Sequence, residues 1–257
     1  TPVSRTWKVT TVDQSYASAA MSYAGFTTVD VETGRTLTLN SGGNSTSPSE
    51  ALGNTNTTPR WDLVKAGGGT WVFSNTDLSN PAGSGPANGA GFIRVDAGTL
   101  DITGDFGRGS LSVNGGTLLS GSFSPFTYGT AGGQFTSGIT QSGLLEVTTA
   151  GGKIGIPATA SSNVSRSAGF YWNQSGSSML TLAARDNLDL LFTTASNFPD
   201  VQSGNTLAIT RDGSGSGKVQ VNDTAVTVSG TLAGNGELKM GAAGTGNLTV
   251  GGRVAPG

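Results

Sequence analysis

The sequence contains neither cysteine nor histidine. Without cysteine the chain forms no disulfide and offers no thiolate to a metal ion. Without histidine it lacks the commonest general base and metal ligand. No catalytic residue, metal site or cofactor is expected.

Charge and long apolar runs are also scarce. Charged residues make up 12% of the chain and the net charge is −2, whereas an average protein has about 25% charged residues. Lysine and arginine do not cluster, so no nucleic-acid partner is expected. No apolar run approaches the ~20 residues of a membrane helix, so we expect no membrane insertion by this chain.

Glycine and small polar residues are abundant instead. Glycine accounts for 42 of the 257 residues, more than twice the usual share of about 7%. Low charge, no cysteine and many serine, threonine and asparagine residues are typical of secreted bacterial surface proteins. We therefore expect an extracellular or cell-surface location, with Thr1 as a processed N-terminus.

The last thirty residues show most clearly how the chain is built. Short apolar alternations are separated by glycine or Gly-Asn turns, which predicts strands and corners with no helix between them. The alternating pairs are Val226 and Val228, Leu238 and Met240, and Leu248 and Val250. So few apolar residues per strand do not close an ordinary sandwich core, but they can line a winding chain of about ten coils, a β-solenoid.

The same pattern begins at Trp61 and recurs along the chain. Each unit has an apolar alternation, a glycine corner, a threonine and a second alternation, with corner threonines at Thr70, Thr99 and Thr117. Uneven spacing of these threonines predicts an insertion near residues 77–90. A second insertion is predicted near residues 157–178. Together these features predict a solenoid domain over residues 61–257.

Residues 1–60 are less regular and are predicted to form an N-terminal strand and cap region. The odd-numbered Val3, Trp7 and Val9 can share one face of a strand. Asp13 followed by an alanine-rich stretch up to Gly25 favours a short helix. The polar segment 41–59 marks the boundary with the solenoid.

Several of these motifs resemble the autotransporter-associated β-strand repeat of Gram-negative surface proteins. They are Leu63 to Ser74, Ala97-Gly-Thr-Leu100, Gly230-Thr-Leu-Ala-Gly-Asn-Gly236 and Gly252-Arg-Val-Ala-Pro-Gly257. The resemblance covers residues 61–121 and 226–257 best. It implies a right-handed parallel β-helix exported to the cell exterior. No barrel or sorting tail follows Gly257 in this sequence, so we expect a processed product, a fragment or one unit of a larger protein.

The Gly/Ser-rich stretch 212–218 is similar to a phosphate-binding loop. Such a loop needs glycine six positions before its lysine and serine or threonine after it. Here those positions hold Asp212 and Val219, so the stretch is interpreted as a turn.

Two groups of carboxylates are candidate sites. Asp96, Asp101 and Asp105 could crowd along one side, as in carbohydrate-cleaving β-helices. Nothing in the sequence fixes their register, so they are interpreted as exposed strand or turn residues, as are Asp186 and Asp189.

Phe170, Tyr171 and Trp172 form the aromatic cluster with a binding interpretation. Their rings could stack on sugars or enter a protein contact. The alternative, which we favour, is a loop that folds back and buries them against the solenoid.

Self-association is predicted from the two ends of the solenoid. Val3, Trp7 and Val9 lie in an extended arm that suits strand addition. Leu248, Val250 and Val254 continue the strand pattern to the other end. The sequence thus predicts a non-enzymatic structural protein, a subunit of a bacterial surface fibre that associates head to tail with itself. The alternatives are an adhesin that binds glycans or other cell-surface proteins and, less favoured, a carbohydrate-active enzyme.

Overall fold

The computed structural model describes residues 5–16, 25–40, 61–74, 91–102, 109–121, 133–134, 140–141, 144–166, 169–223 and 225–257. Nearly all regular structure in these ranges is β-strand, and the strands pair almost entirely in parallel. The described helix is a single 3-10 turn, η2 (Ala195–Asn197). Nowhere in these ranges does a helix combine the length and apolarity needed to cross a membrane.

Two long parallel sheets dominate the structure. The seven-stranded sheet contains, in order, β1 (Arg5–Val9), β3 (Gly25–Val31), β5 (Trp61–Ala66), β7 (Gly91–Val95), β9 (Gly109–Val113), β13 (Leu144–Val147) and β16 (Gly169–Trp172). The ten-stranded sheet contains, in order, β2 (Gln14–Tyr16), β4 (Thr36–Asn40), β6 (Thr70–Ser74), β8 (Thr99–Ile102), β10 (Thr117–Ser120), β14 (Gly152–Gly155), β17 (Met179–Arg185), β19 (Thr206–Asp212), β22 (Thr231–Gly234) and β25 (Val254–Pro256).

Three smaller sheets complete the described structure. A four-stranded parallel sheet contains β15 (Val164–Arg166), β18 (Leu190–Phe192), β20 (Val219–Val221) and β23 (Leu238–Met240). A parallel pair joins β21 (Ala225–Val228) to β24 (Asn247–Val250). An antiparallel pair joins β11 (Gly133–Gln134) to β12 (Thr140–Gln141).

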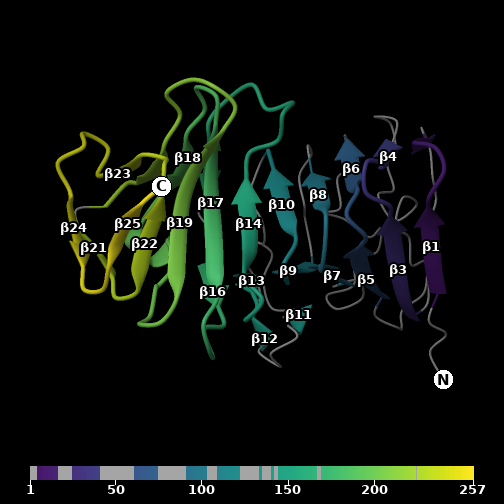
Figure 1. The fold of residues 1–257 in the computed structure, drawn as a ribbon, viewed down its shortest axis with the longest axis horizontal. Coiled ribbons are helices and arrows are strands. Elements are labelled where there is room, and N and C mark those ends of the chain that lie inside the picture. The colour runs from purple at the N-terminus through teal and green to yellow at the C-terminus, as the bar shows by residue number, and fades with distance from the viewer. Residues whose placement is uncertain are drawn as a thin grey trace, which may run out of the picture.

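The chain passes from sheet to sheet and adds one strand to each sheet that it visits. We call the consecutive strands of one pass a layer. The first layers contain β1 with β2, β3 with β4 and β5 with β6, and later layers such as β16, β17 and β18 contribute to three sheets. Figure 1 shows the layers following one another along the longest axis, from β1 at one end to β24 at the other. At ~4.8 Å per strand, a ten-stranded sheet extends about 45 Å.

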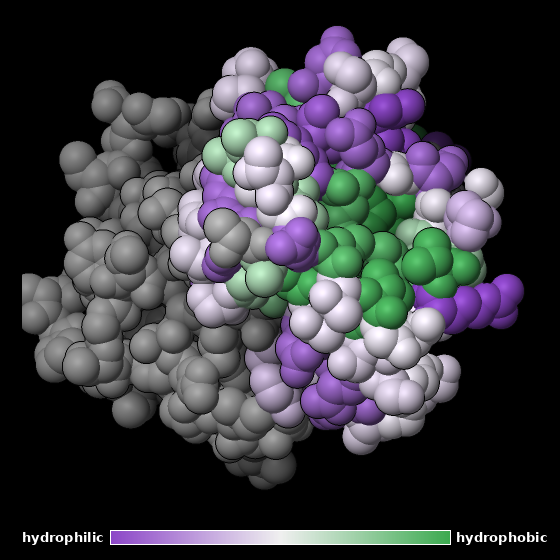
Figure 2. Space-filling model, turned by 90° about the vertical axis from the view of Figure 1, so that its left-hand side faces the viewer, coloured by the Kyte–Doolittle hydropathy of each residue, from purple (hydrophilic) through white to green (hydrophobic). Residues whose placement is uncertain are grey.

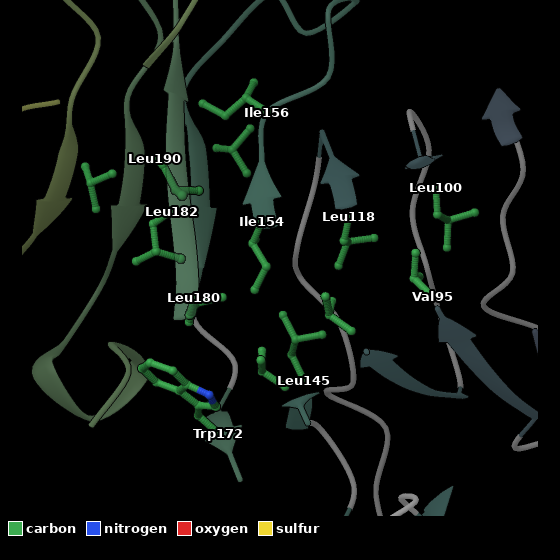
Figure 3. Packing of buried hydrophobic residues seen from close by; sticks show 14 of the residues in the cluster. Val95, Leu100, Leu118, Leu145, Ile154, Ile156, Trp172, Leu180, Leu182 and Leu190 are labelled. Carbon is green, nitrogen blue, oxygen red and sulfur yellow. The ribbon is translucent and has the colours of Figure 1, made fainter. Parts of the chain in front are cut away.

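Stacked aliphatic side chains form the core. Alternate residues of a strand point to the same face, and in-register parallel pairing places equivalent residues above one another. One column in the ten-stranded sheet runs through Leu37, Trp71, Leu100, Leu118, Ile154, Leu182 and Ile209. All of these side chains are buried, and Figure 3 shows several of them pointing into the interior. One or two residues per strand therefore suffice for a continuous core.

The corner threonines occupy equivalent positions, which confirms the repeat unit predicted from the sequence. Thr70 pairs with Thr99, and Thr99 pairs with Thr117. Thr36, which lies in the predicted cap region, pairs with Thr70 and extends the same row. The repeat therefore begins earlier in the chain than its sequence pattern indicated.

Two expectations for the N-terminal region need correction. Residues 14–16 of the predicted helix form strand β2, which pairs with β4, while residues 17–24 lie outside the described residues. Ladder hydrogen bonds to β4 outweigh the helix propensity of this stretch. In addition, β3 pairs with β5 and β4 with β6. Residues 5–40 therefore belong to the same sheets as residues 61–74, without an architectural break at residue 60.

The segment 157–178, predicted as an insertion, contributes two strands to the sheets. Strand β15 pairs with β18, and β16 pairs with β13. Within this segment, residues 164–166 and 169–172 therefore belong to the layers. The other predicted insertion, near residues 77–90, lies outside the described residues.

We expect the two faces of β17 to respond differently to truncation. Leu182 is fully buried in the interior column, so Leu182→Ala should lower the free energy of unfolding by about 2–5 kcal/mol. Thr181→Ala, on the opposite face of the same strand, should change it by less than about 0.5 kcal/mol. Denaturant unfolding measures both, and equal losses would contradict the inward register.

Candidate functional site

The outermost strands of the sheets form the two ends of the stack of layers. At one end lie β1 and β2, and at the other lie β23, β24 and β25. Within the described chain each of these strands pairs with a single neighbouring strand. The outer side of such an edge strand directs a row of backbone N–H and C=O groups outward, where another strand can pair.

The end formed by β23, β24 and β25 is apolar as well as open. Val254 is the last member of the column Leu180, Leu207, Leu232 and Val254. It is 61% exposed, whereas Leu180 and Leu207 are fully buried. Figure 2 looks onto this end and shows a continuous apolar area bordered by hydrophilic residues. The interior column thus reaches the surface here.

The predicted joint residues differ in how available their side chains are. Leu248 and Val250 in β24 are half-buried. At the other end Val9 is fully buried and the half-buried Trp7 packs against the core. These two side chains pack within their own layer. The backbone edge of β1 is therefore the part of this strand that is available to pair with a strand of another molecule. Val3 lies outside the described residues.

The aromatic segment is positioned by β16, whose alternate residues face opposite ways. Trp172 points into the interior, is 6% exposed, and donates from Nε1 to Ser178 Oγ over 3.0 Å; Figure 3 shows its ring beneath the aliphatic column. Tyr171 faces the other way and is half-buried beside its register partner Glu146. The Phe170 side chain is not among those described. The Trp172 ring is therefore not available to stack on a sugar.

The Gly/Ser-rich stretch 212–218 forms the corner between β19 and β20, and its amides bind the preceding corner. Ser214 N–H donates to Asp186 Oδ1 over 3.1 Å and Ser216 N–H to Asn187 Oδ1 over 3.0 Å. Lys218 N–H donates to Asp189 Oδ1 over 2.9 Å. An internal carboxylate thus occupies the position that a phosphate would take in a phosphate-binding loop.

Asp186 and Asp189 therefore have a structural role that the sequence pattern did not reveal. Their oxygens accept backbone N–H groups of the next layer where no strand provides an acceptor. Asp13 Oδ1 does the same for Thr36 N–H over 2.8 Å, and Asn163 Oδ1 for Asp189 N–H over 2.8 Å. The available signal is an Asp or Asn one layer before a corner amide, but uneven layer lengths conceal that spacing in the sequence.

Of the other candidate carboxylates, the two that the structure describes, Asp96 and Asp101, do not form an acid pair. Asp96 follows β7 and is bound by Arg94 Nε over 2.5 Å and by Asn114 Nδ2 over 2.8 Å. Burial raises the pKa of Asp96, but the hydrogen bonds from Arg94 and Asn114 together lower it by more. The pKa of Asp96 therefore lies below its ordinary value. Asp101 lies in β8 of the other long sheet, where burial raises its pKa to about 6. Asp105 lies outside the described residues.

Neither a metal site nor a comparison with known proteins adds a functional assignment. Among the described residues, no group of three or more carboxylates is placed to hold a metal ion. No protein-family model, curated protein or solved structure matches the chain. The candidate site therefore rests on the geometry of the ends of the sheets.

We expect Asp186 to stabilise the corner rather than to bind a ligand. Its φ of 47° is left-handed, a conformation that Asp and Asn tolerate better than Ala. Asp186→Ala should cost about 1–2 kcal/mol of unfolding free energy, mainly through strain in the left-handed conformation and in part through loss of the Ser214 hydrogen bond, whereas Asp186→Asn should remain near wild type. Inorganic phosphate should not raise the melting temperature beyond chloride of equal ionic strength. A saturable rise would contradict the occupied-corner interpretation.

Proposed function

We propose that this chain is an extracellular structural protein: a β-solenoid, of the right-handed parallel β-helix type, that forms part of a bacterial surface fibre by head-to-tail association. The supporting observation is the apolar end at β24 and β25. There an interior column emerges at Val254 and the outer edges of the sheets are open to pairing within the described chain.

The occupant that suits this end is a further layer of parallel strands with aliphatic side chains facing inward. Such a layer covers Val254 and pairs with the outer edges of β24 and β25. The first layer of a second copy meets these requirements, since β1 and β2 have outer edges of their own and Val9 faces inward. Contact between unlike ends does not close on itself, so it propagates into a filament.

The extracellular setting is supported by composition and by the motifs. A cysteine-free, weakly charged, glycine-rich chain suits an exported fibre. The motifs at residues 97–100 and 230–236 resemble the autotransporter-associated repeat, and this resemblance also supports an extracellular setting. The aromatic segment gives the adhesin alternative less support, because the interior holds the ring of Trp172.

The assembly is tested by placing a charge on the apolar end. Val254 and Met179 are both exposed, at 61% and 56%, but Met179 starts a strand in the middle of the ten-stranded sheet. Val254→Lys should abolish concentration-dependent assembly because the ammonium would be buried in the joint. Met179→Lys should leave assembly unchanged. Sedimentation velocity and electron microscopy provide the measurement, with melting temperature as the folding control.

Deletion of residues 1–12 tests the other side of the joint. Removal of β1 should prevent elongation. Because its first layer is altered, the truncated chain should also fail to bind the end of a full-length filament that is formed by β24 and β25. If the full chain stays monodisperse at high concentration, or if Val254→Lys assembles like wild type, head-to-tail association through this end does not occur.

A further inference from the structure

The interior column of the seven-stranded sheet contains a lysine. In register, this column runs through Val29, Lys65, Val95, Val113, Val147 and Trp172. Lys65 is fully buried, as are the valines on either side of it. A buried lysine is costly unless its N–H groups find acceptors, so its surroundings must be built to receive it.

Three backbone carbonyl oxygens surround the Lys65 ammonium. Lys65 Nζ donates to Ala66 O over 2.6 Å, to Gly67 O over 2.8 Å and to Ala97 O over 3.1 Å. An ammonium has three N–H donors, and here each has an acceptor. Ala66 is the last residue of β5 and Gly67 begins the corner after it, whereas Ala97 belongs to the corner after β7. One side chain therefore ties together the corners of two successive layers.

Glycines keep this space open. Gly98 adopts a φ of +62°, and a Cβ there would lie 2.3 Å from Gly69 O, 2.4 Å from Gly67 O and 2.8 Å from Lys65 Nζ. A side chain at position 98 would thus occupy the space that the ammonium and its carbonyl acceptors require. The buried ammonium of Lys65 and the glycine at position 98 therefore depend on each other.

The charged group that faces the ammonium is Asp30, which lies on β3, the strand paired with β5 on one side. On the other side β7 packs Val95 against Lys65, and Arg94 of β7 pairs with Asp96, the residue that follows this strand. Burial lowers the pKa of Lys65 to about 8, and Asp30 partly opposes this shift.

We propose that the carbonyl oxygens of Ala66, Gly67 and Ala97 form a binding site for a primary ammonium ion, which the chain fills with its own Lys65 to latch two layers together. When the Lys65 side chain is cut back, the same site takes up a free alkylammonium. This site is independent of the proposed assembly through the ends.

The site predicts a pH dependence with a definite sign. The unfolded chain holds the Lys65 proton up to its ordinary pKa of 10.5, whereas the folded chain releases it near 8. The unfolded state therefore binds more protons between these values, and stability should rise as the pH increases from about 8 to about 10.5. Lys65→Met, which removes the titrating group, should lack this part of the rise.

Direct titration of the folded wild-type protein tests the environment of Lys65. In carbon-13 spectra of lysine-labelled protein, the resonance that disappears in Lys65→Met should titrate with a midpoint near 8. A midpoint at the ordinary lysine value would contradict the predicted rise in stability, because the folded and unfolded chains would then release the Lys65 proton at the same pH.

Chemical rescue tests the ligand class. Lys65→Ala removes the atoms that propylammonium supplies, so propylammonium should raise the denaturation midpoint of this variant saturably and leave wild type unchanged. Tetramethylammonium, which has no N–H donor, should act only as a salt. Lys218→Ala, at a surface pair with Glu237, is the matched control and should not respond. If Lys65→Ala folds only with propylammonium the proposal stands. If both ammonium salts act alike, or neither restores folding, it falls.

Gly98→Ala should damage the same site by crowding it. Gly34 also has a positive φ, +79°, but nothing lies within 4 Å of a Cβ built there. Gly34→Ala therefore reports the backbone strain alone. We expect Gly98→Ala to lower the denaturation midpoint more than Gly34→Ala, and equal losses would mean that the space around the ammonium is not tightly built.

Discussion

In-register parallel pairing is the constraint on which the rest of this structure depends. It places each residue above its equivalent in the neighbouring layer, so the chemistry of one layer is imposed on the next. Aliphatic residues therefore stack on aliphatic residues, as in the column from Leu37 to Ile209, and threonines stack on threonines at the corners. A chain with few apolar residues acquires a continuous core in this way, because each column gains contacts from both of its neighbours.

The same pairing leaves backbone groups without partners wherever the chain leaves a strand. The corner amides gain hydrogen bonds within the protein where side chains of the neighbouring layer offer acceptors that strands do not supply. Carboxylate and amide side chains provide these acceptors, as Asp186 and Asp189 do for the corner after β19. The sparse charge of the chain is thus used partly for backbone pairing between layers, and this use accounts for carboxylates that could otherwise be taken for a catalytic group.

The local sequence pattern predicted the strands and the corners well, because strands follow from apolar/polar alternation and corners from glycine. Thr70, Thr99 and Thr117 could be aligned from the sequence for this reason. Long-range pairing could not be predicted in the same way. Residues 14–16 are helix-compatible alone and become a strand through β4, and residues 164–172 lack a clear repeat yet join two sheets. The continued alternation over residues 244–257 predicts an unguarded strand edge at this end, and burial of Trp172 is the interpretation that its sequence favours. The inward positions of Trp7 and Val9 depend on a register that only the assembled sheets define.

A stack of similar layers also has a register problem, and Lys65 offers a solution to it. A column made only of valine would lose little if one strand were paired one layer out of place, because valine would still meet valine. A lysine cannot be moved in this way without loss, since its ammonium would keep the carbonyl oxygens of Ala66 and Gly67 but leave that of Ala97, which belongs to the next layer. A buried polar residue in the repetitive core of a coiled coil fixes the register of the helices by the same kind of penalty. The cost of burying one lysine is thereby turned into a preference for a single order of layers.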